Sequence, residues 1–351
     1  MKTTAAIQLS DEPKLIVDDI ELPDPGSGQV SVKLMSSGVC HSQLHQMQNL
    51  SIPKPSLFGH EGAGIVTGVG EGVSHVKEGD SVIVTWVRRN PIQGRIPADP
   101  TGASYHEIPI STPVYTWSED VLTSGELVVP VGSHYPLDII SIVGCAVLTG
   151  AGAVMNTAQV RPGESVAVYG AGGVGLCAIQ MASILEAYPI IAVDLLDEKL
   201  EFSKKFGATH TINASIENPI EKIIEITGGG ADYAMDAIGI KLTNEQILSS
   251  TRGGGPGADN HGGMAVLIGM PGSEPMSLDP ALFMLHQRTY RGSLGATYPE
   301  KDFELFLRWF EEGKFPLDQL VTQRYRLEDI NRACSDLENG KIFGRAIIDY
   351  Q

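Results

Sequence analysis

Three side chains that can bind a metal stand beside glycines in the first half of the chain. Cys40 lies in Gly-Val-Cys-His-Ser, His60 in Gly-His-Glu-Gly, and Cys145 directly follows a glycine. Thiolates and imidazoles are ligands that zinc prefers, and three protein ligands leave the fourth tetrahedral corner free, as in catalytic zinc sites. The three residues therefore predict a catalytic zinc rather than a structural one.

A glycine-rich loop follows, between an expected strand at 165–169 and an expected helix at 174–187. The glycines let the backbone approach a pyrophosphate, which the N–H groups and the dipole of the helix attract. Asp194 ends the next expected strand, where a carboxylate binds the adenosine ribose hydroxyls and repels a 2′-phosphate, so NAD is favoured over NADP. The alternative is a structural turn followed by a helix-capping aspartate. The loop consists of Gly170, Ala171, Gly172, Gly173, Val174 and Gly175.

Composition narrows the choice of function. A net charge of −17 argues against nucleic acid and anionic membranes as partners, because both attract basic surfaces. Four cysteines are too few for a disulfide scaffold, and no apolar leader or 18-residue apolar run is present, so we expect a cytoplasmic protein without a membrane span. A Lewis-acid metal and a dinucleotide in such a chain indicate oxidation of an alcohol or reduction of a carbonyl.

The 351 residues favour two domains. Residues 1–147 contain short β-branched runs separated by Gly, Pro and Asp, which predict a β-rich domain, with a partly closed barrel as one arrangement. Residues 148–294 alternate strands and helices, which predicts an α/β domain with a doubly wound parallel Rossmann sheet. Residues 295–351 return to the first domain with a helix at 301–312 and a closing strand at 345–349.

Essentially the whole chain resembles the zinc-dependent alcohol dehydrogenases of the medium-chain dehydrogenase/reductase superfamily. The zinc-free quinone-reductase-like branch of that superfamily lacks the ligand pattern, and the polyol branch typically has an acidic residue at the position of Cys145, so the alcohol branch fits better. The resemblance implies a GroES-like fold for the β-rich catalytic domain. The matching motifs are Gly38-Val39-Cys40-His41-Ser42, Gly59-His60-Glu61-Gly62, Gly144-Cys145 with Thr149-Gly150, and the glycine loop with Asp194.

The resemblance also implies a role for each matching residue. Cys40, His60 and Cys145 would bind the zinc, with Glu61 as an occasional alternate ligand. Ser42 would take the proton of the alcohol, and the nicotinamide ribose and His45 would pass it to solvent, although simple polarity at a helix start would also explain Ser42 and His45. The remaining cofactor contacts would be His41, Thr149, Lys199, Ile238, Ile268 and Arg345, and the substrate pocket would contain Trp86, Trp117 and Met270.

The chain departs from the family at two places. Gln43 stands where the family usually has an aspartate that hydrogen-bonds the zinc-bound histidine. The glutamine carbonyl could orient the imidazole without adding charge, so we expect a more electron-poor zinc or weaker metal retention. In addition, residues 86–113 contain no cysteine, whereas many relatives carry four there in a second, structural zinc lobe.

The substrate is less constrained. Two tryptophans would favour a primary alcohol or aldehyde with an apolar or aromatic body, although core packing would explain them equally well. The alternatives are a class III-like formaldehyde-adduct or aryl alcohol dehydrogenase and, in another class, a catalytically silent NAD-binding protein. We also expect a homo-oligomer, a dimer or a tetramer, because family subunits often join at the strand at 264–268.

The absence of cysteine from residues 86–113 predicts one zinc per subunit. Elemental analysis of the purified protein against its subunit concentration measures this ratio directly. A stoichiometry of two zinc ions per subunit would contradict the prediction.

Overall fold

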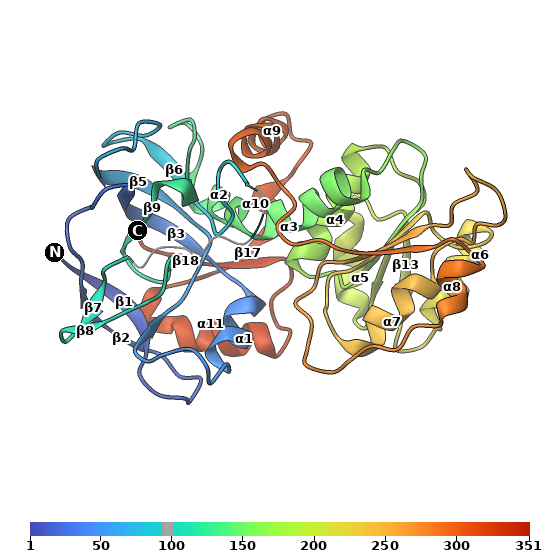
Figure 1. Cartoon of the computed structure of the whole chain (residues 1–351), viewed down its shortest axis with the longest axis horizontal. Coiled ribbons are helices and arrows are strands. Elements are labelled where there is room, and N and C mark those ends of the chain that lie inside the picture. The colour runs from blue at the N-terminus through green and yellow to red at the C-terminus, as the bar shows by residue number, and fades with distance from the viewer. Residues whose placement is uncertain (93, 95–100) are drawn as a thin grey trace. The chain divides into compact units, whose positions relative to one another are not determined.

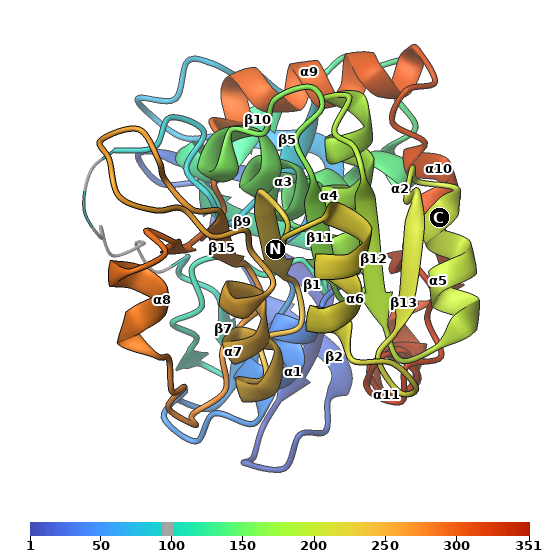
Figure 2. The same cartoon turned by 90° about the vertical axis from the view of Figure 1, so that its right-hand side faces the viewer.

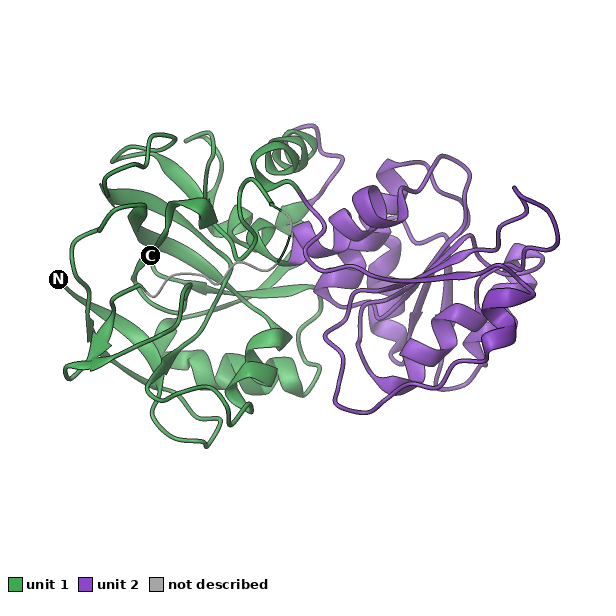
Figure 3. Ribbon diagram, in the orientation of Figure 1, with its two compact units in different colours: residues 1–145, 298–310, 317–351 green, residues 146–297, 311–316 purple. Residues whose placement is uncertain are grey.

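The computed structural model describes residues 1–92, 94 and 101–351 of the chain. These residues form two compact units (Figure 3). The first contains residues 1–145, 298–310 and 317–351, and the second contains residues 146–297 and 311–316. The expected boundaries lie at 147 and 294, and the short segment 311–316 groups with the second unit.

The first unit contains two sheets, with strand orders β4-β1-β2-β7-β8 and β10-β6-β5-β3-β18-β17, and β9 pairs with β3 in addition. The strands of the first sheet are β1 Lys2–Gln8, β2 Ile16–Glu21, β4 Ser56–Leu57, β7 Ser104–Tyr105 and β8 Ile108–Pro109. Those of the second are β3 Gln29–Val39, β5 Gly62–Val69, β6 Ser81–Val84, β9 Asp120–Ser124, β10 Val128–Pro130, β17 Val321–Tyr325 and β18 Arg345–Asp349. A β-rich first domain was expected, and the structure confirms it.

Strand β3 organises the second of these sheets. One edge pairs with β5, while the other pairs first with β9 and then, from Ser36 to Val39, with β18. Ala346 lies opposite Val39, one residue before Cys40. The end of the chain therefore supports the end of β3, which explains why the closing strand returns to this unit.

Helices cover part of this framework. Helix α1 follows β3 and contacts α11, and Figure 1 shows these two helices side by side. A core of buried residues that includes Val39, Met47 and Ile330 fills the space beneath them. The helices of the unit are α1 His41–Met47, α2 Leu137–Ile140, α9 Pro299–Glu311, whose last residue groups with the second unit, α10 Leu317–Leu320 and α11 Ile330–Glu338.

The second unit is built on a parallel sheet of order β13-β12-β11-β14-β15-β16, the doubly wound order expected for a dinucleotide-binding fold. Helices α5, α6 and α7 contact its strands (Figure 2). The strands are β11 Val166–Tyr169, β12 Ile190–Asp194, β13 His210–Asn213, β14 Tyr233–Asp236, β15 Met264–Leu267 and β16 Thr289–Gly292. The helices are α3 Ala146–Gly152, α4 Gly173–Ile184, α5 Asp197–Lys204, α6 Pro219–Thr227, α7 Lys241–Ser249 and α8 Pro280–Met284.

One expectation about this sheet is wrong. Strand β15, the expected joining strand, pairs with β14 on one side and β16 on the other, so its backbone groups are already used within the chain. The two edges of the sheet are β13 and β16, and β16 is the one next to β15.

Among the described residues, no single helix is both long and apolar enough to cross a membrane. One bent pair, Leu137–Gly144 with Ala146–Ala158, meets that test by length and composition alone.

Candidate metal and dinucleotide sites

The first predicted metal ligand lies at the junction of β3 and α1. Cys40 has an extended backbone, with φ −121° and ψ 140°, and α1 begins at the next residue. Its side chain is buried, and the Ser42 hydroxyl lies 3.3 Å from its Sγ atom. The end of the strand thus positions the thiol, and the first turn of the helix brings Ser42 beside it.

All four predicted metal residues come together. One donor atom each from Cys40, His60, Glu61 and Cys145 lies within 4.8 Å of the others, and all four residues are buried. The two Sγ atoms are 4.0 Å apart, and His60 Nε2 is 3.0 Å from Cys145 Sγ. Two thiolates bound to one tetrahedral zinc lie about 3.8 Å apart. The donor set therefore fits zinc, with Nε2 as the imidazole nitrogen that faces the thiols.

Two glycines allow this close approach. A Cβ atom on Gly38 would run into the carboxyl group of Glu61. A Cβ atom on Gly144, in the 3₁₀ turn Ser141–Gly144 before Cys145, would lie 2.5 Å from the carbonyl oxygen of Val84. A larger residue at position 38 would displace the Glu61 carboxyl group, and one at position 144 would displace the turn before Cys145 from Val84.

A buried ion pair lies behind the thiols. Arg345, the first residue of β18, pairs with Glu61, and their side chains are 5% and 0% exposed. Glu61 is therefore held by a cation, and a move toward the metal position would weaken this pair. The Arg345 Nε atom is buried without a hydrogen-bond partner among the described residues. The expected contact of Arg345 with the pyrophosphate stays a prediction.

The cysteines differ in acidity. The hydrogen bond with Cys145 contributes most to holding the pKa of the Cys40 thiol well below its usual range; burial opposes it, and His60 and Arg345 lower the pKa further. Burial raises the pKa of Cys177, and raises that of Cys334 to about 12. Only a thiolate binds zinc, so the acidity agrees with ligation by Cys40 and with packing roles for the other two.

The expected proton-relay residues lie on α1. The Ser42 hydroxyl is 3.5 Å from His60 Nε2 as well as close to Cys40, so it faces the metal position. His45, one turn later, is exposed, and so is His41. Ser42 is thus inside the site and His45 in contact with solvent, as a relay requires, although their roles stay predictions.

The two tryptophans lie in different environments. Trp86 meets the His60 ring edge-on, with the ring centroids 6.5 Å apart, and its buried Nε1 has no hydrogen-bond partner in the described part of the chain. Trp117 is 1% exposed, packs in the core beside Phe58 and donates its Nε1–H to the carbonyl of Gly38. Trp86 therefore borders the metal residues. Trp117 is instead a core residue whose hydrogen bond to Gly38 fixes the end of β3, two residues before Cys40.

The expectation that the carbonyl of Gln43 orients the imidazole is wrong. The side-chain Oε1 accepts from the backbone N–H of Gly59, and the amide Nε2 faces His60 Nδ1 instead. The N–H of Gly59 can only donate, so the carbonyl oxygen has to turn toward it.

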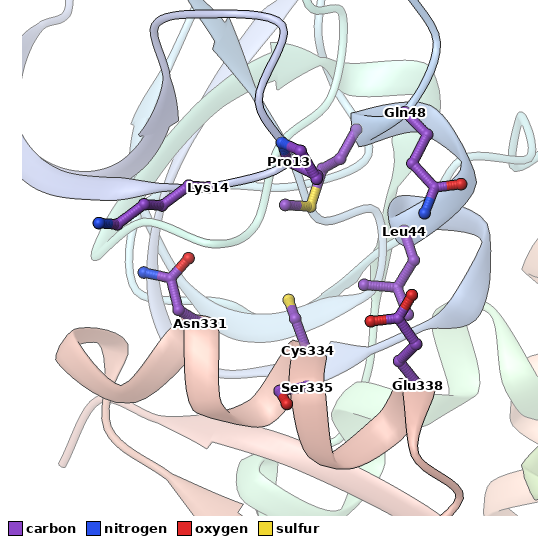
Figure 4. A pocket seen from close by; sticks show the side chains of 9 residues that line it. Pro13, Lys14, Leu44, Gln48, Asn331, Cys334, Ser335 and Glu338 are labelled. Atoms are coloured by element: carbon purple, nitrogen blue, oxygen red, sulfur yellow. The ribbon is translucent and has the colours of Figure 1, made fainter.

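A separate pocket of about 310 Å³ lies between α1, α11 and the segment around Pro13 (Figure 4). Leu44 lines it from α1, and the Cys334 thiol points into it from α11. None of the predicted site residues lines this pocket, so it is distinct from the metal cluster.

In the second unit, the glycine loop connects β11 to α4. Gly170 has a φ of +97°, and a Cβ atom there would lie 2.7 Å from Ile238 Cγ1. Gly172 precedes the first residue of α4, and a Cβ atom there would meet nothing within 4 Å. The loop therefore leaves open space before the helix N-terminus, where a pyrophosphate binds in this type of fold.

Asp194 lies beside this loop. Its Oδ2 accepts from the N–H of Ala171 at 2.8 Å, and its Oδ1 accepts from the N–H groups of Leu195 and Leu196. These bonds fix the carboxylate while leaving it lone pairs for ribose hydroxyls.

The other predicted cofactor residues are spread over the second unit. Ile238 is exposed beside Gly170, and the N–H of Ile268 donates to the carbonyl of Asp236, so both lie at the carboxyl ends of parallel strands. Lys199 is half-buried on α5, Met270 is exposed, and the buried hydroxyl of Thr149 has no partner among the described residues.

Sequence reasoning missed Asp236. This buried carboxylate at the end of β14 accepts from the N–H groups of Ile238 and Gly239 and from the Thr243 hydroxyl. Burial raises its pKa. An aspartate ending an apolar strand was the available signal, as it was for Asp194.

The buried pair leads to a stability prediction. Glu61→Ala leaves Arg345 buried without its carboxylate, and we expect a loss of about 3–5 kcal/mol in the free energy of unfolding. The double variant Glu61→Ala with Arg345→Met removes both charges, so its free energy of unfolding should fall by less than that of Glu61→Ala alone. Denaturant unfolding of wild type, both single variants (Glu61→Ala and Arg345→Met) and the double variant measures this, and a double variant as unstable as the sum of the two single changes would contradict it.

Comparison with known proteins shows the family of the chain. Residues 26–133 match the alcohol dehydrogenase GroES-like domain, and residues 173–312 match the zinc-binding dehydrogenase model. The chain is 33% identical to the NDMA-dependent alcohol dehydrogenase of Amycolatopsis methanolica, over 97% of both chains. It is 31% identical to the S-(hydroxymethyl)glutathione dehydrogenase of Paracoccus denitrificans, over the full length of both.

A solved structure of an alcohol dehydrogenase is also similar to the whole chain. The benzyl alcohol dehydrogenase of Acinetobacter calcoaceticus is 28% identical, with a TM-score of 0.88 over the whole of both chains. Full-length similarity above 30% and the gathered zinc donors lead to one conclusion: the chain belongs to the zinc-containing alcohol dehydrogenases of the medium-chain dehydrogenase/reductase superfamily.

Proposed function

We propose that the chain transfers a hydride between a primary alcohol with an apolar or aromatic body and NAD. In the forward direction the alcohol carbon loses a hydride to NAD and its oxygen loses a proton, giving an aldehyde and NADH. The observation that carries the proposal is the buried group of Cys40, His60 and Cys145, with the Ser42 hydroxyl beside it.

The residues divide the chemistry between them. Cys40, His60 and Cys145 would hold the zinc, with Glu61 behind them as an alternate ligand. Bound zinc acts as a Lewis acid that lowers the pKa of an alcohol oxygen and polarises a carbonyl. The Ser42 hydroxyl accepts the proton, and the exposed His45 passes it to solvent. A hydroxyl cannot retain the proton, so the relay needs this second group.

The second unit supports a preference for NAD. The carboxylate of Asp194 would bind the ribose hydroxyls and repel a 2′-phosphate. Leu195 and Leu196 follow it, both exposed, and neither offers a cation to such a phosphate. The glycine loop would hold the pyrophosphate, His41 would contact it, Lys199 would flank the adenosine, and Thr149, Ile238 and Ile268 would border the nicotinamide.

Trp86 supports an aromatic or apolar substrate. Its ring lies edge-on to His60, so it offers a flat apolar wall beside the metal position. A relative of known structure is named for benzyl alcohol. The alternative substrate is the glutathione adduct named for another relative. That adduct is anionic, and a chain of net charge −17 exerts no long-range attraction on it.

The second unit also supports a homo-oligomer. Strand β16 leaves one edge of the parallel sheet unpaired within the described chain. Met284, Leu285 and Leu294 nearby in sequence are 75%, 58% and 72% exposed. An open edge with exposed apolar side chains favours association with a second copy. Light scattering during size exclusion tests this, and a monomeric mass would contradict it.

The function is tested by following NADH absorbance with a panel of alcohols, with NAD or NADP, before and after treatment with a chelator. We expect turnover of benzyl alcohol and similar primary alcohols with NAD, and loss of turnover when zinc is removed. Formaldehyde with glutathione tests the alternative substrate. Zinc-loaded protein that binds NAD but oxidises no alcohol would favour the catalytically silent protein.

The relay is tested by Ser42→Ala in the same assay. We expect kcat to fall by about 100-fold or more because the proton acceptor is lost, while the zinc content stays unchanged. Ser51→Ala, at an exposed serine in the turn after α1, is the matched control.

A further inference from the structure

The side-chain amide of Gln43 faces three groups: the N–H of Gly59, Nδ1 of His60 and Oε1 of Gln46. Gln43 is 2% exposed and lies on α1, between the backbone of Gly59 and the Nδ1 face of the ring. Its amide Nε2 also lies 3.1 Å from Oε1 of Gln46, one turn along the helix.

The neighbours of this amide determine its orientation. The N–H of Gly59 is a donor that only an acceptor can satisfy, so Oε1 faces it. The NH₂ group then faces His60 and Gln46, whose Oε1 accepts one of its two hydrogens. Turning the amide over would place its NH₂ group against the buried N–H of Gly59 and leave both donors unsatisfied.

This orientation determines which nitrogen of His60 carries the proton. A neutral imidazole has one donor and one acceptor nitrogen, and the bond made by one nitrogen sets the state of the other. Because the Gln43 NH₂ group donates to Nδ1, the proton resides on Nε2, which lies 3.0 Å from Cys145 Sγ. In this arrangement Nε2–H donates to the sulfur.

Zinc needs the other tautomer, because Nε2 faces the thiols and must offer its lone pair to the ion. The proton then belongs on Nδ1, where it meets the NH₂ group of Gln43. Binding the ion therefore has one of two costs. Either the Gln43 NH₂ group and the His60 Nδ1–H, both donors, face each other, or the Gln43 amide turns and loses its bond to the N–H of Gly59.

We propose that Gln43 is a positioning residue that favours the non-ligating tautomer of His60 and so makes the zinc site of this chain fast to release its ion. The inference rests on the proposed function, because it takes Cys40, His60 and Cys145 as the zinc ligands. A carboxylate at position 43 would accept from both Gly59 N–H and His60 Nδ1–H, which removes the conflict.

The test compares zinc release from zinc-loaded wild type and Gln43→Glu, a change of nearly equal size and shape. Each protein is mixed with excess chromogenic chelator, and the release rate and the competition constant are measured. We expect Gln43→Glu to slow release and tighten binding by about 10- to 100-fold, the range measured for groups that hydrogen-bond metal-ligating histidines.

Gln46→Glu is the matched control. It introduces the same charge one turn away at an exposed position, where it accepts from Gln43 but does not face His60. We expect its release rate to stay within about twofold of wild type, because exposed charges contribute little. Should Gln43→Glu fail to fold by thermal unfolding, Gln43→Asp replaces it with the same acceptor on a shorter side chain, and the same direction of change is expected.

The outcomes separate the inference from the function. Slower release in Gln43→Glu alone supports the inference. Equal slowing in Gln43→Glu and Gln46→Glu would assign the effect to charge rather than tautomer and overturn it, as would no slowing in Gln43→Glu. A wild-type protein that binds no zinc even when zinc is added in excess would contradict the proposed function itself.

Discussion

Burial of two thiols, an imidazole and a carboxylate in one small volume is the constraint on which the rest of this structure depends. An unpaired charge in this buried volume would cost free energy of folding, so each charged group needs a partner of opposite charge. Arg345 balances Glu61, and the two charges of a zinc ion would balance the two thiolates. Cys40 directly follows β3, His60 and Glu61 directly precede β5, Cys145 follows the turn Ser141–Gly144, and Arg345 begins β18. The sheet that joins β3, β5 and β18 is therefore what brings this charge-balanced group together.

The sequence predicted those parts of the fold and site that depend on local pattern. The expected strand that ends at Asp194 and the closing strand at 345–349 correspond to β12 and β18, and the zinc donors were recognisable from their glycine-flanked motifs. The Glu61–Arg345 pair could not be found this way, because its members are 284 positions apart and meet only through the pairing of β18 with β3. The orientation of Gln43 was misjudged for a similar reason, since it depends on a backbone N–H from another segment.

The two units contribute different kinds of chemistry. In the second unit the backbone shapes most of the region that a dinucleotide would occupy. This backbone includes the glycine loop, the carboxyl ends of the parallel strands, and the N–H groups that donate to Asp194 and Asp236. In the first unit the side chains of a few buried residues form the site. A substitution of one such side chain therefore changes the metal position directly. The amide of Gln43, for example, changes which nitrogen of His60 is available without altering the backbone.

Zinc K-edge X-ray absorption spectroscopy on the purified protein tests the central claim most directly, because it reports the ligand atoms of the ion. Ligation by Cys40, His60 and Cys145 predicts two sulfur scatterers at about 2.3 Å and lighter N/O scatterers, including an imidazole, at about 2.0–2.1 Å. A spectrum with four sulfurs, or with only oxygen and nitrogen around the zinc, would contradict the account.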